Sequence, residues 1–386
     1  MLRGGTSRCS LVGTGSIGVG RAILLAYSLS FFGVLLSSRR CQFISVVGVP
    51  NMLRKYLSRF CRAFCFGLVL SASCTVIAPC YAEDLTIIDA AKAGVDYTIQ
   101  GEYLGVIDAD SGRTWGAQVI ALGKGKFRCV GYPGGLPGDG FDPSESVRET
   151  DGALDGAAAK FTSNEFELVA DGKTLKVQDL SGAELGTLQK VERESATLGA
   201  KPPEGAVVLF DGKDASAWEG GRLTAEGYLD IGTSSKQKFN DFTLHLEFRT
   251  PFMPESRGQG RGNSGMYLQS RYEVQILDSF GLSGENNECG GIYQIARPKV
   301  NMCYPPLRWQ TYDVDFTSAK YDAAGKKISD ATANIRHNGI VIHKDLVFPR
   351  ATPGREGESN SPGAIFLQDH GNPVAFRNIW IVEKSK

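Results

Sequence analysis

The chain has 386 residues, enough for two or three domains, and its 42 basic residues balance its 42 acidic ones. The balance is uneven along the chain. The first 82 residues contain nine basic residues and no Asp or Glu, so the remainder keeps 33 basic and 42 acidic residues and a net charge of −9. This acidic remainder predicts a soluble protein and argues against nucleic acid as a partner.

The segment that follows Met52 has the order of parts found in a secretory signal peptide. A basic stretch (Leu53–Arg62) precedes an apolar run (Ala63–Ala78), and Cys80-Tyr81-Ala82 ends on a small residue. The run is too short for a comfortable membrane span. We therefore expect a signal peptide over 52–82, cleavage before Glu83, and an exported protein, periplasmic or extracellular, with no stable membrane span.

Two alternatives for the beginning of the chain stay open. Residues 1–51 contain a second apolar stretch, Ala22–Leu36, which could be a transmembrane helix, but we favour the interpretation that 1–51 are a non-native extension or leader before Met52. Lipid anchoring at Cys74 is less favoured than plain secretion, because Ser71-Ala72-Ser73 makes a poor lipobox.

Six of the nine cysteines lie in this removable segment, which leaves Cys129, Cys289 and Cys303. These three form no CxxC pair and have no histidine nearby, so we expect no zinc site. In an exported protein we expect a disulfide between Cys289 and Cys303, with Cys129 as a small buried apolar residue.

Residues 83–195 predict a small all-β domain. After a helical or extended start (Leu85–Gly94), turn signals separate short apolar runs, and a Gly- and Pro-rich stretch (Tyr132–Asp142) predicts a shaped loop. The expected strands are Tyr97–Ile107, Trp115–Leu122, Lys126–Val130, Glu165–Val169, Thr174–Asp179 and Leu185–Val191. We favour a packing or spacer role over a second binding module. Residues 196–205, with Pro202-Pro203, predict a linker.

Residues 206–386 predict a second all-β domain. Phe242–Arg249 alternates apolar and polar residues, and Asn338-Gly339 is a strong hairpin signal. The closing strands are expected at Ala364–His370 and Val374–Val382. Many strands with little helical periodicity indicate a sandwich of two sheets.

The most informative stretch is Gly262–Asp278. Its second half places Tyr272, Val274 and Ile276 on one face of a strand and Glu273 and Gln275 on the other. A strand of this kind suits a sandwich layer whose outer side is a wet, concave site. On these grounds we expect the floor of a polar pocket here.

Six sequence blocks occur in a fixed order in the second domain: G-N-S-G-M-Y-L, Y-E-V-Q-I-L-D-S, C-G-G-I-Y, W-Q-T-Y-D, H-N-G and F-L-Q-D-H-G-N-P-V-A-F-R-N-I-W. Together they resemble the 3-keto-disaccharide hydrolase domain family over about Glu204–Glu383. The resemblance implies a concanavalin-like jelly-roll β-sandwich with one concave face. It also implies an exported enzyme that cleaves 3-keto-glycosides and 3-keto-disaccharides by elimination and hydration, with an oxidised sugar or glycan as substrate.

Two residues are the candidate catalytic groups. Glu273 lies on the polar face of its strand, and His370 ends a signature block at a strand end, where side chains can converge on a pocket. Which of them is the base and which the acid stays open. We expect His337 and His343 at the surface, and His245 paired with Glu247 on one strand face.

Candidate binding residues supply amides, aromatic rings and one guanidinium group. They are Asn263, Gln275, Asp278, Tyr293, Trp309, Gln310, Gln368 and Arg377. Asp278 could also be a turn residue, or a residue that orients a neighbouring site residue. No cofactor is expected, although a divalent cation near Glu273 and Asp278 stays an alternative.

Two further alternatives concern function. A retaining glycosidase of a related sandwich fold needs a second carboxylate on the strand, and Gln275 stands in its place, so ordinary double displacement is not favoured. A non-catalytic, lectin-like carbohydrate-binding module of a surface or secreted glycan-utilisation system would have the same fold. A structural domain of a surface assembly is the third option.

Overall fold

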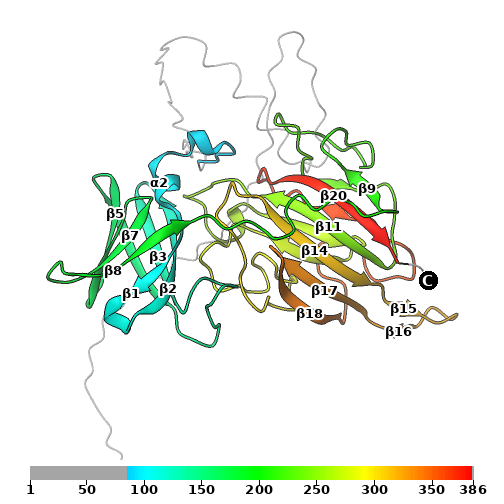
Figure 1. Ribbon diagram of the computed structural model, residues 1–386. Helices are drawn as coiled ribbons and strands as arrows, with labels where there is room; N and C mark the ends of the chain where they lie inside the picture. Colours follow the sequence, from blue (N-terminus) through cyan, green and yellow to red (C-terminus); the bar gives the residue numbers. More distant parts are fainter. Residues whose placement is uncertain (1–84, 385–386) are drawn as a thin grey trace, which may run out of the picture. The chain divides into compact units, whose positions relative to one another are not determined.

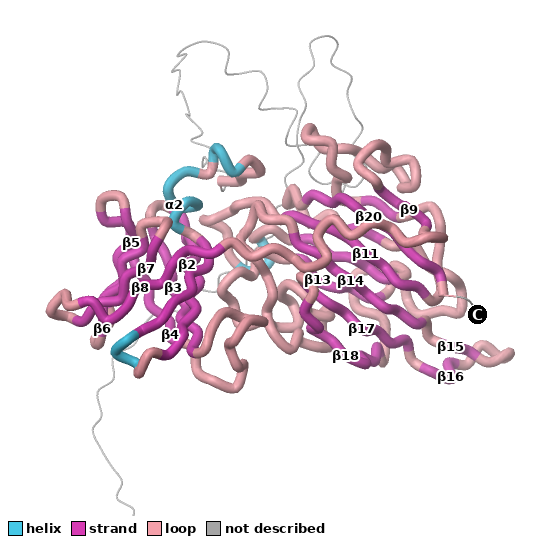
Figure 2. The backbone as a smooth tube through the Cα atoms, in the orientation of Figure 1, coloured by secondary structure: helices cyan, strands magenta, loops and turns pink. Residues whose placement is uncertain are grey.

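The computed structural model describes residues 85–384, which consist mainly of antiparallel strands and loops (Figure 1 and Figure 2). The all-β fold class expected from the sequence is confirmed. The predicted extension over 1–51, the signal peptide over 52–82 and the alternative anchor at Cys74 lie outside the described residues. Within 85–384, no helix is long and apolar enough to cross a membrane.

The first eight strands form a closed barrel in which each strand pairs with the next. The last strand pairs with the first, for example Val191 with Glu102, so the sheet has no open edge. Its elements are η1 (Ala90–Lys92), α2 (Gly94–Ile99), β1 (Gly101–Ile107), η2 (Asp108–Asp110), β2 (Arg113–Gly123), β3 (Lys126–Pro133), β4 (Arg148–Asp155), β5 (Ala158–Thr162), β6 (Phe166–Ala170), β7 (Thr174–Asp179) and β8 (Glu184–Val191).

Two of these strands, β4 and β5, are not among those predicted from the sequence. Strand β4 carries one large apolar residue, Leu154, and at Gly152 an added Cβ would overlap the ring of Phe161 on β5. Close packing thus favours a glycine at a position where an apolar residue would have indicated a strand, and the alternation pattern of β4 is lost. The expected strand over 97–107 was wrong in its first residues, because 94–99 form helix α2.

The second part of the chain is a sandwich of two main sheets. One sheet has the order β10-β19-β12-β13 and the other β18-β17-β14-β11-β20-β9, with a small β15-β16 ribbon beside them. The elements are β9 (Val207–Phe210), β10 (Thr233–Ser234), β11 (Phe242–Arg249), η3 (Gly258–Gly260), β12 (Ser264–Leu268), β13 (Tyr272–Ile276), β14 (Gln310–Thr317), β15 (Lys320–Tyr321), β16 (Lys327–Ser329), β17 (Ala331–His337), β18 (Ile340–Phe348), β19 (Phe366–Leu367) and β20 (Ala375–Glu383).

The core of the sandwich lies between the two sheets. Strand β13 contributes Tyr272, Val274 and Ile276, each 1% exposed or less, as its alternation predicts. Strand β11 contributes its apolar face in the same way, with Leu244 and Leu246 fully buried. The sheet faces away from this core carry the polar side chains, which is where candidate sites are found.

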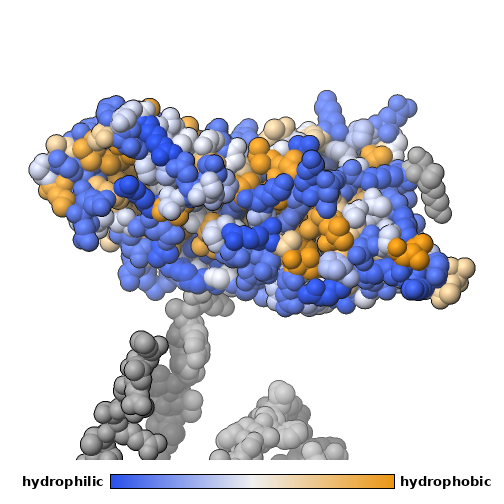
Figure 3. All heavy atoms as spheres, turned by 90° about the horizontal axis from the view of Figure 1, so that it is seen from below, coloured by the Kyte–Doolittle hydropathy of each residue, from blue (hydrophilic) through white to orange (hydrophobic). Residues whose placement is uncertain are grey.

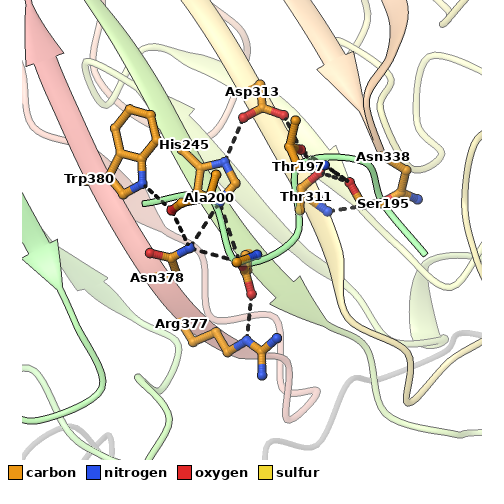
Figure 4. Close-up of polar contacts among 12 residues, drawn as sticks. Ser195, Thr197, Ala200, His245, Thr311, Asp313, Asn338, Arg377, Asn378 and Trp380 are labelled. Carbon is orange, nitrogen blue, oxygen red and sulfur yellow. Dashed lines mark hydrogen bonds and ion pairs between the residues drawn. The ribbon is translucent and has the colours of Figure 1, made fainter. Parts of the chain in front are cut away.

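The outer face of the larger sheet is crossed by the segment predicted to be a linker. Residues 195–200, which we call the strap, hydrogen-bond to three strands of this sheet (Figure 4). Thr197 Oγ1 donates to Asp313 on β14 (2.6 Å), and the backbone of Ala200 accepts from Asn378 and Trp380 on β20 (3.0 and 3.1 Å). This half of the expected linker is therefore bound to the sandwich.

The barrel and the sandwich lie in one compact unit of the chain. Ile120 and Tyr132 of the barrel belong to the same buried apolar cluster as the sandwich core, and Arg261 donates to the backbone oxygen of Ala121 at 3.2 Å. On the face drawn in Figure 3, hydrophilic residues predominate and apolar residues form separate patches.

Candidate active site

The β12–β13 hairpin is the floor of the candidate site. In its register, Tyr267 faces Glu273 and Gly265 faces Gln275. The turn residues Gln269 and Ser270 both have positive φ (52° and 55°), a conformation that twists the hairpin tightly. A Cβ at residue 265 would overlap the Glu273 carboxylate, so any other residue there would force this carboxylate to shift.

Glu273 is buried, with 3% of its surface exposed. A loop after β18 covers it, and Thr352 of that loop accepts a hydrogen bond from the Glu273 backbone nitrogen (2.9 Å). Burial raises the pKa of Glu273 to about 7, although a hydrogen bond with Tyr267 acts in the opposite direction. The face of β13 that the sequence predicts to be wet is therefore largely covered by this loop.

Tyr267 is a hydrogen-bond partner of the Glu273 side chain. Burial and the neighbouring Glu273 carboxylate raise the pKa of Tyr267 above its usual value, so its hydroxyl keeps its proton. Gln368 Nε2 donates to this hydroxyl at 3.4 Å. Gln368 Oε1 is buried and finds no hydrogen-bond partner among residues 85–384, which leaves an acceptor for a bound molecule.

Three amide side chains form a connected group beside Glu273. Gln275 Nε2 donates to Gln259 Oε1 (2.9 Å), and Asn263 Nδ2 donates to the same oxygen (3.1 Å). The backbone nitrogen of Asn263 donates to Asn372 Oδ1 (2.8 Å), which holds the Gly-Asn-Ser-Gly segment in place. These hydrogen bonds fix the orientation of the three amides before any ligand binds.

These side chains enclose a pocket of about 220 Å³, the Glu273 pocket. His370 is exposed, which places it at the rim. The lining residues are Gln259, Asn263, Tyr267, Glu273, Gln275, Tyr293, Pro353, Gly354, Gln368 and His370. Six of the ten site residues predicted from the sequence therefore meet here: Asn263, Glu273, Gln275, Tyr293, Gln368 and His370.

Four predicted site residues lie elsewhere. Asp278 is buried and paired with Arg261 (2.7 Å). Gln310 is fully buried, and its Oε1 accepts from the backbone of Tyr304 (2.8 Å). Trp309 and Arg377 do not line the pocket either; they stack on each other, with the guanidinium carbon 4.1 Å from the ring centre. Arg377 is on β20 and Trp309 contacts it beside the larger sheet, whose outer face is described next.

The outer face of the larger sheet carries a second polar cluster, centred on His245. Its Nδ1 lies 2.6 Å from Asp313 Oδ1, and Trp380 stacks on its ring (Figure 4). Burial opposes the charged imidazolium, but hydrogen bonds to Asp313 and Glu247 outweigh it, so the pKa of His245 is raised. The strap covers this cluster, in agreement with the satisfied His245–Glu247 pair expected from the sequence.

Asn378 explains how β20 joins that cluster. It has a positive φ of 44° at a bulge where two residues of β20 stand opposite Leu246. Its side chain donates to Glu247 Oε1 (2.9 Å), and Arg377 Nε donates to Glu247 Oε2 (2.6 Å). Burial acts to raise the pKa of Glu247, but these hydrogen bonds, with those from His245 and the Gly199 backbone, lower it to about 2.

The expectation that His337 and His343 lie at the surface was wrong. His337 is fully buried, and its Nε2 lies 3.0 Å from Gln310 Oε1. Burial lowers the pKa of His337 to about 3, so the ring is neutral. His343 Nε2 donates to the backbone oxygen of Gly290 (2.7 Å). The His337 ring links β17 to Gln310 on the neighbouring strand β14, and the His343 ring links β18 to the loop that carries Gly290. Neither role has a local sequence pattern.

Cys289 and Cys303 lie together as free thiols in the core of the sandwich. Their side chains hydrogen-bond to each other, and burial raises the pKa of Cys303. Cys289 and Cys303 are thus neighbours, as the predicted disulfide requires. The disulfide bond between them stays a prediction. Cys129 is buried in the barrel, as expected.

The alternative of a divalent cation rests on Glu273 and Asp278 as ligands. The Asp278 carboxylate, however, already forms an ion pair with Arg261. Among residues 85–384, no three His, Cys, Asp or Glu side chains converge in a way that could hold a metal ion.

Two pocket residues, Gln259 and Tyr267, were not predicted from the sequence. Gln259 is in the short helix η3, outside every signature block, and no pattern in the sequence marks it as a site residue. Tyr267 is in the block G-N-S-G-M-Y-L, two residues from Gly265, so its strand face could have been deduced from the pattern of alternation.

One family model and three crystal structures match the second part of this chain or a similar share of it. Residues 205–382 match the model of a family described as the 3-keto-alpha-glucoside-1,2-lyase-like domain. Three crystal structures from Parabacteroides distasonis ATCC 8503, each provisionally described as a glycosyl hydrolase, match 47% of this chain. They share 34%, 20% and 18% identity over 85%, 95% and 94% of their own chains, with TM-scores of 0.43, 0.33 and 0.29. No curated protein matches the chain.

Proposed function

Since this chain belongs, through residues 205–382, to the 3-keto-alpha-glucoside-1,2-lyase-like domain family, we propose that it cleaves 3-keto-glycosides in the Glu273 pocket. The observation that carries this proposal is the single carboxylate that the described residues bring to the pocket, buried and with a pKa of about 7. A retaining glycosidase needs two carboxyl groups about 5 Å apart. One base and one acid suit elimination better.

The chemistry follows from the ketone at sugar position three, which acidifies the C–H bond at position two. A carboxylate takes that proton, the C–H electron pair forms the C1–C2 double bond, and the C1–O bond breaks as the leaving oxygen gains a proton. Water then adds its hydroxyl to C1 and a proton returns to C2. No step needs a nucleophile on the protein or an oxidant.

We assign the base to Glu273 and the acid to His370. Glu273 lies on the pocket floor, where burial makes its carboxylate a stronger base near neutral pH. His370 is at the exposed rim, where a departing group and water can reach it. The Tyr267 hydroxyl and one N–H of the Gln259 amide would be donors for the enolate oxygen and the sugar hydroxyls. The Asn263 amide orients Gln259, because both of its N–H groups donate to that residue.

The test is turnover of a 3-keto-glycoside in D₂O by the purified protein. Elimination and hydration would place deuterium at C2 of the released 3-keto-sugar, because the proton returns from solvent. Cleavage without deuterium at C2, or equal cleavage of the unoxidised glycoside, would contradict the mechanism. Saturable binding of the 3-keto-glycoside without any turnover would instead support the lectin-like alternative.

A further inference from the structure

The barrel β1–β8 contains a cavity of about 330 Å³ that the proposed sugar chemistry does not use. Residues from seven of the eight strands line it, among them Trp115, Ala117, Cys129, Leu168, Val177 and Leu188. All six are buried within the barrel core. Interiors of folded proteins rarely leave space beyond the size of a water molecule, so a cavity of this size needs an explanation.

Small residues at facing positions leave part of the barrel interior open. The rings of Tyr103, Phe127 and Phe161 are fully buried elsewhere in the barrel core and do not line the cavity. Ala117 and Gly131, which do line it, are cross-strand partners on β2 and β3. A Cβ on Gly131 would lie 3.6 Å from the Trp115 ring, in ordinary contact, so the glycine is not required by crowding.

The open end carries polar groups of both signs. Trp115 Nε1 donates to Asp110 Oδ2 (2.8 Å), and the Arg148 guanidinium lies 5.4 Å from the centre of the Trp115 ring. Arg148 also pairs with Glu165 at 3.7 Å, and both side chains are more than half exposed. These groups line the cavity together with its apolar residues.

We propose that this barrel binds one small, uncharged molecule with an aromatic or branched apolar body and a polar end group. An eight-stranded barrel has room for one small ligand when its side chains do not fill it. The apolar walls would take the body, and Asp110 or Arg148 at the mouth would take the polar end. A charged body is disfavoured, because the inner walls offer it no counter-charge.

The proposal can be tested with N-phenyl-1-naphthylamine, an uncharged aromatic dye that fluoresces in apolar surroundings. Titration of the full chain should give saturable binding of one dye per chain. Ala117→Phe and Val177→Phe each place a ring inside the cavity and should weaken binding at least tenfold. Val106→Phe, on the exposed outer side of β1, is the matched control and should bind like wild type.

The melting temperature of each variant shows whether it is folded. Two cavity positions are tested so that one folded variant suffices if the other does not fold. If the dye does not saturate, or if a folded cavity variant binds it as tightly as the Val106→Phe control, the barrel is not a ligand site. Turnover of a 3-keto-glycoside is a separate readout, so failure here would leave the proposed function untouched.

Discussion

Glu273 combines two properties that seldom occur together, a buried carboxylate and no cationic partner among the contacts described. Its pKa of about 7 means that the folded protein holds a proton that the unfolded chain loses near pH 4.5. The unfolded state therefore binds fewer protons between these two values, and the free energy of unfolding must fall as pH rises through this interval.

The first prediction is the size of that pH effect. Wild type should lose up to about 3 kcal/mol of stability between pH 4.5 and pH 7.5 through this one group. Glu273→Gln cannot titrate and should lose less over the same interval. Urea unfolding of both proteins at several pH values measures the difference. Parallel curves for the two proteins would mean that Glu273 titrates normally.

The second prediction concerns turnover. Glu273→Gln keeps the shape of the side chain but removes the base, so turnover of a 3-keto-glycoside should fall by about 10²–10⁴-fold with little change in affinity. His370→Asn should act likewise, and the double variant should lose less than the product of the two effects. Glu285→Gln, a carboxylate outside the pocket, is the control. Wild-type turnover by Glu273→Gln would overturn the catalytic assignment.

At the scale of elements, the β12–β13 hairpin makes room for the base Glu273 because Gly265, on the facing strand, has no side chain. Gly265→Ala would push a methyl group into the Glu273 carboxylate, and we expect turnover to fall at least tenfold with the fold retained. Gly260→Ala, in η3 nearby, has no atom within 4 Å of its new Cβ and is the matched control. Circular dichroism and turnover rates of the two variants check this third prediction; equal turnover would show that the hairpin tolerates a Cβ there.

The strap is the second element that tertiary structure defines. The Gly199 backbone nitrogen donates to Glu247 Oε1 (2.6 Å), and Glu247 is 1% exposed. Glu247→Gln removes the negative charge that faces His245 and Arg377, so unfolding free energy should drop by about 3–5 kcal/mol. The strap should then become a site of proteolysis near Lys201. Unchanged urea stability and protease resistance would show that the strap is held independently of Glu247.

At the scale of the whole molecule, export and the thiol pair are linked, because disulfides persist in oxidising compartments. The fifth prediction is that protein recovered from the periplasm or medium begins at Glu83 and lacks two hydrogens, through a Cys289–Cys303 bond. Closing this loop would stabilise the fold by about 3 kcal/mol. Intact mass measures both changes. A chain that still begins at Met1 would exclude cleavage, and three free thiols would exclude the bond.

The sequence by itself determined what depends on local period and order. The alternation in Y-E-V-Q-I determined which side of β13 enters the core and therefore the face on which Glu273 lies. The ordered blocks indicated the family, and turn signals indicated an all-β chain. These properties survive in sequence because side-chain direction in a strand is set by neighbouring residues alone.

Only the tertiary structure decided which polar residues meet. Asp278 follows the pocket strand β13 closely in sequence and Gln310 belongs to a signature block, yet Arg261 and Tyr304 hold them elsewhere. Gln259 instead reaches the pocket from the short helix η3. The barrel cavity likewise depends on Ala117 and Gly131 being paired across strands. Such convergence is set by register, sheet order and loop packing, which are long-range properties that no local pattern encodes.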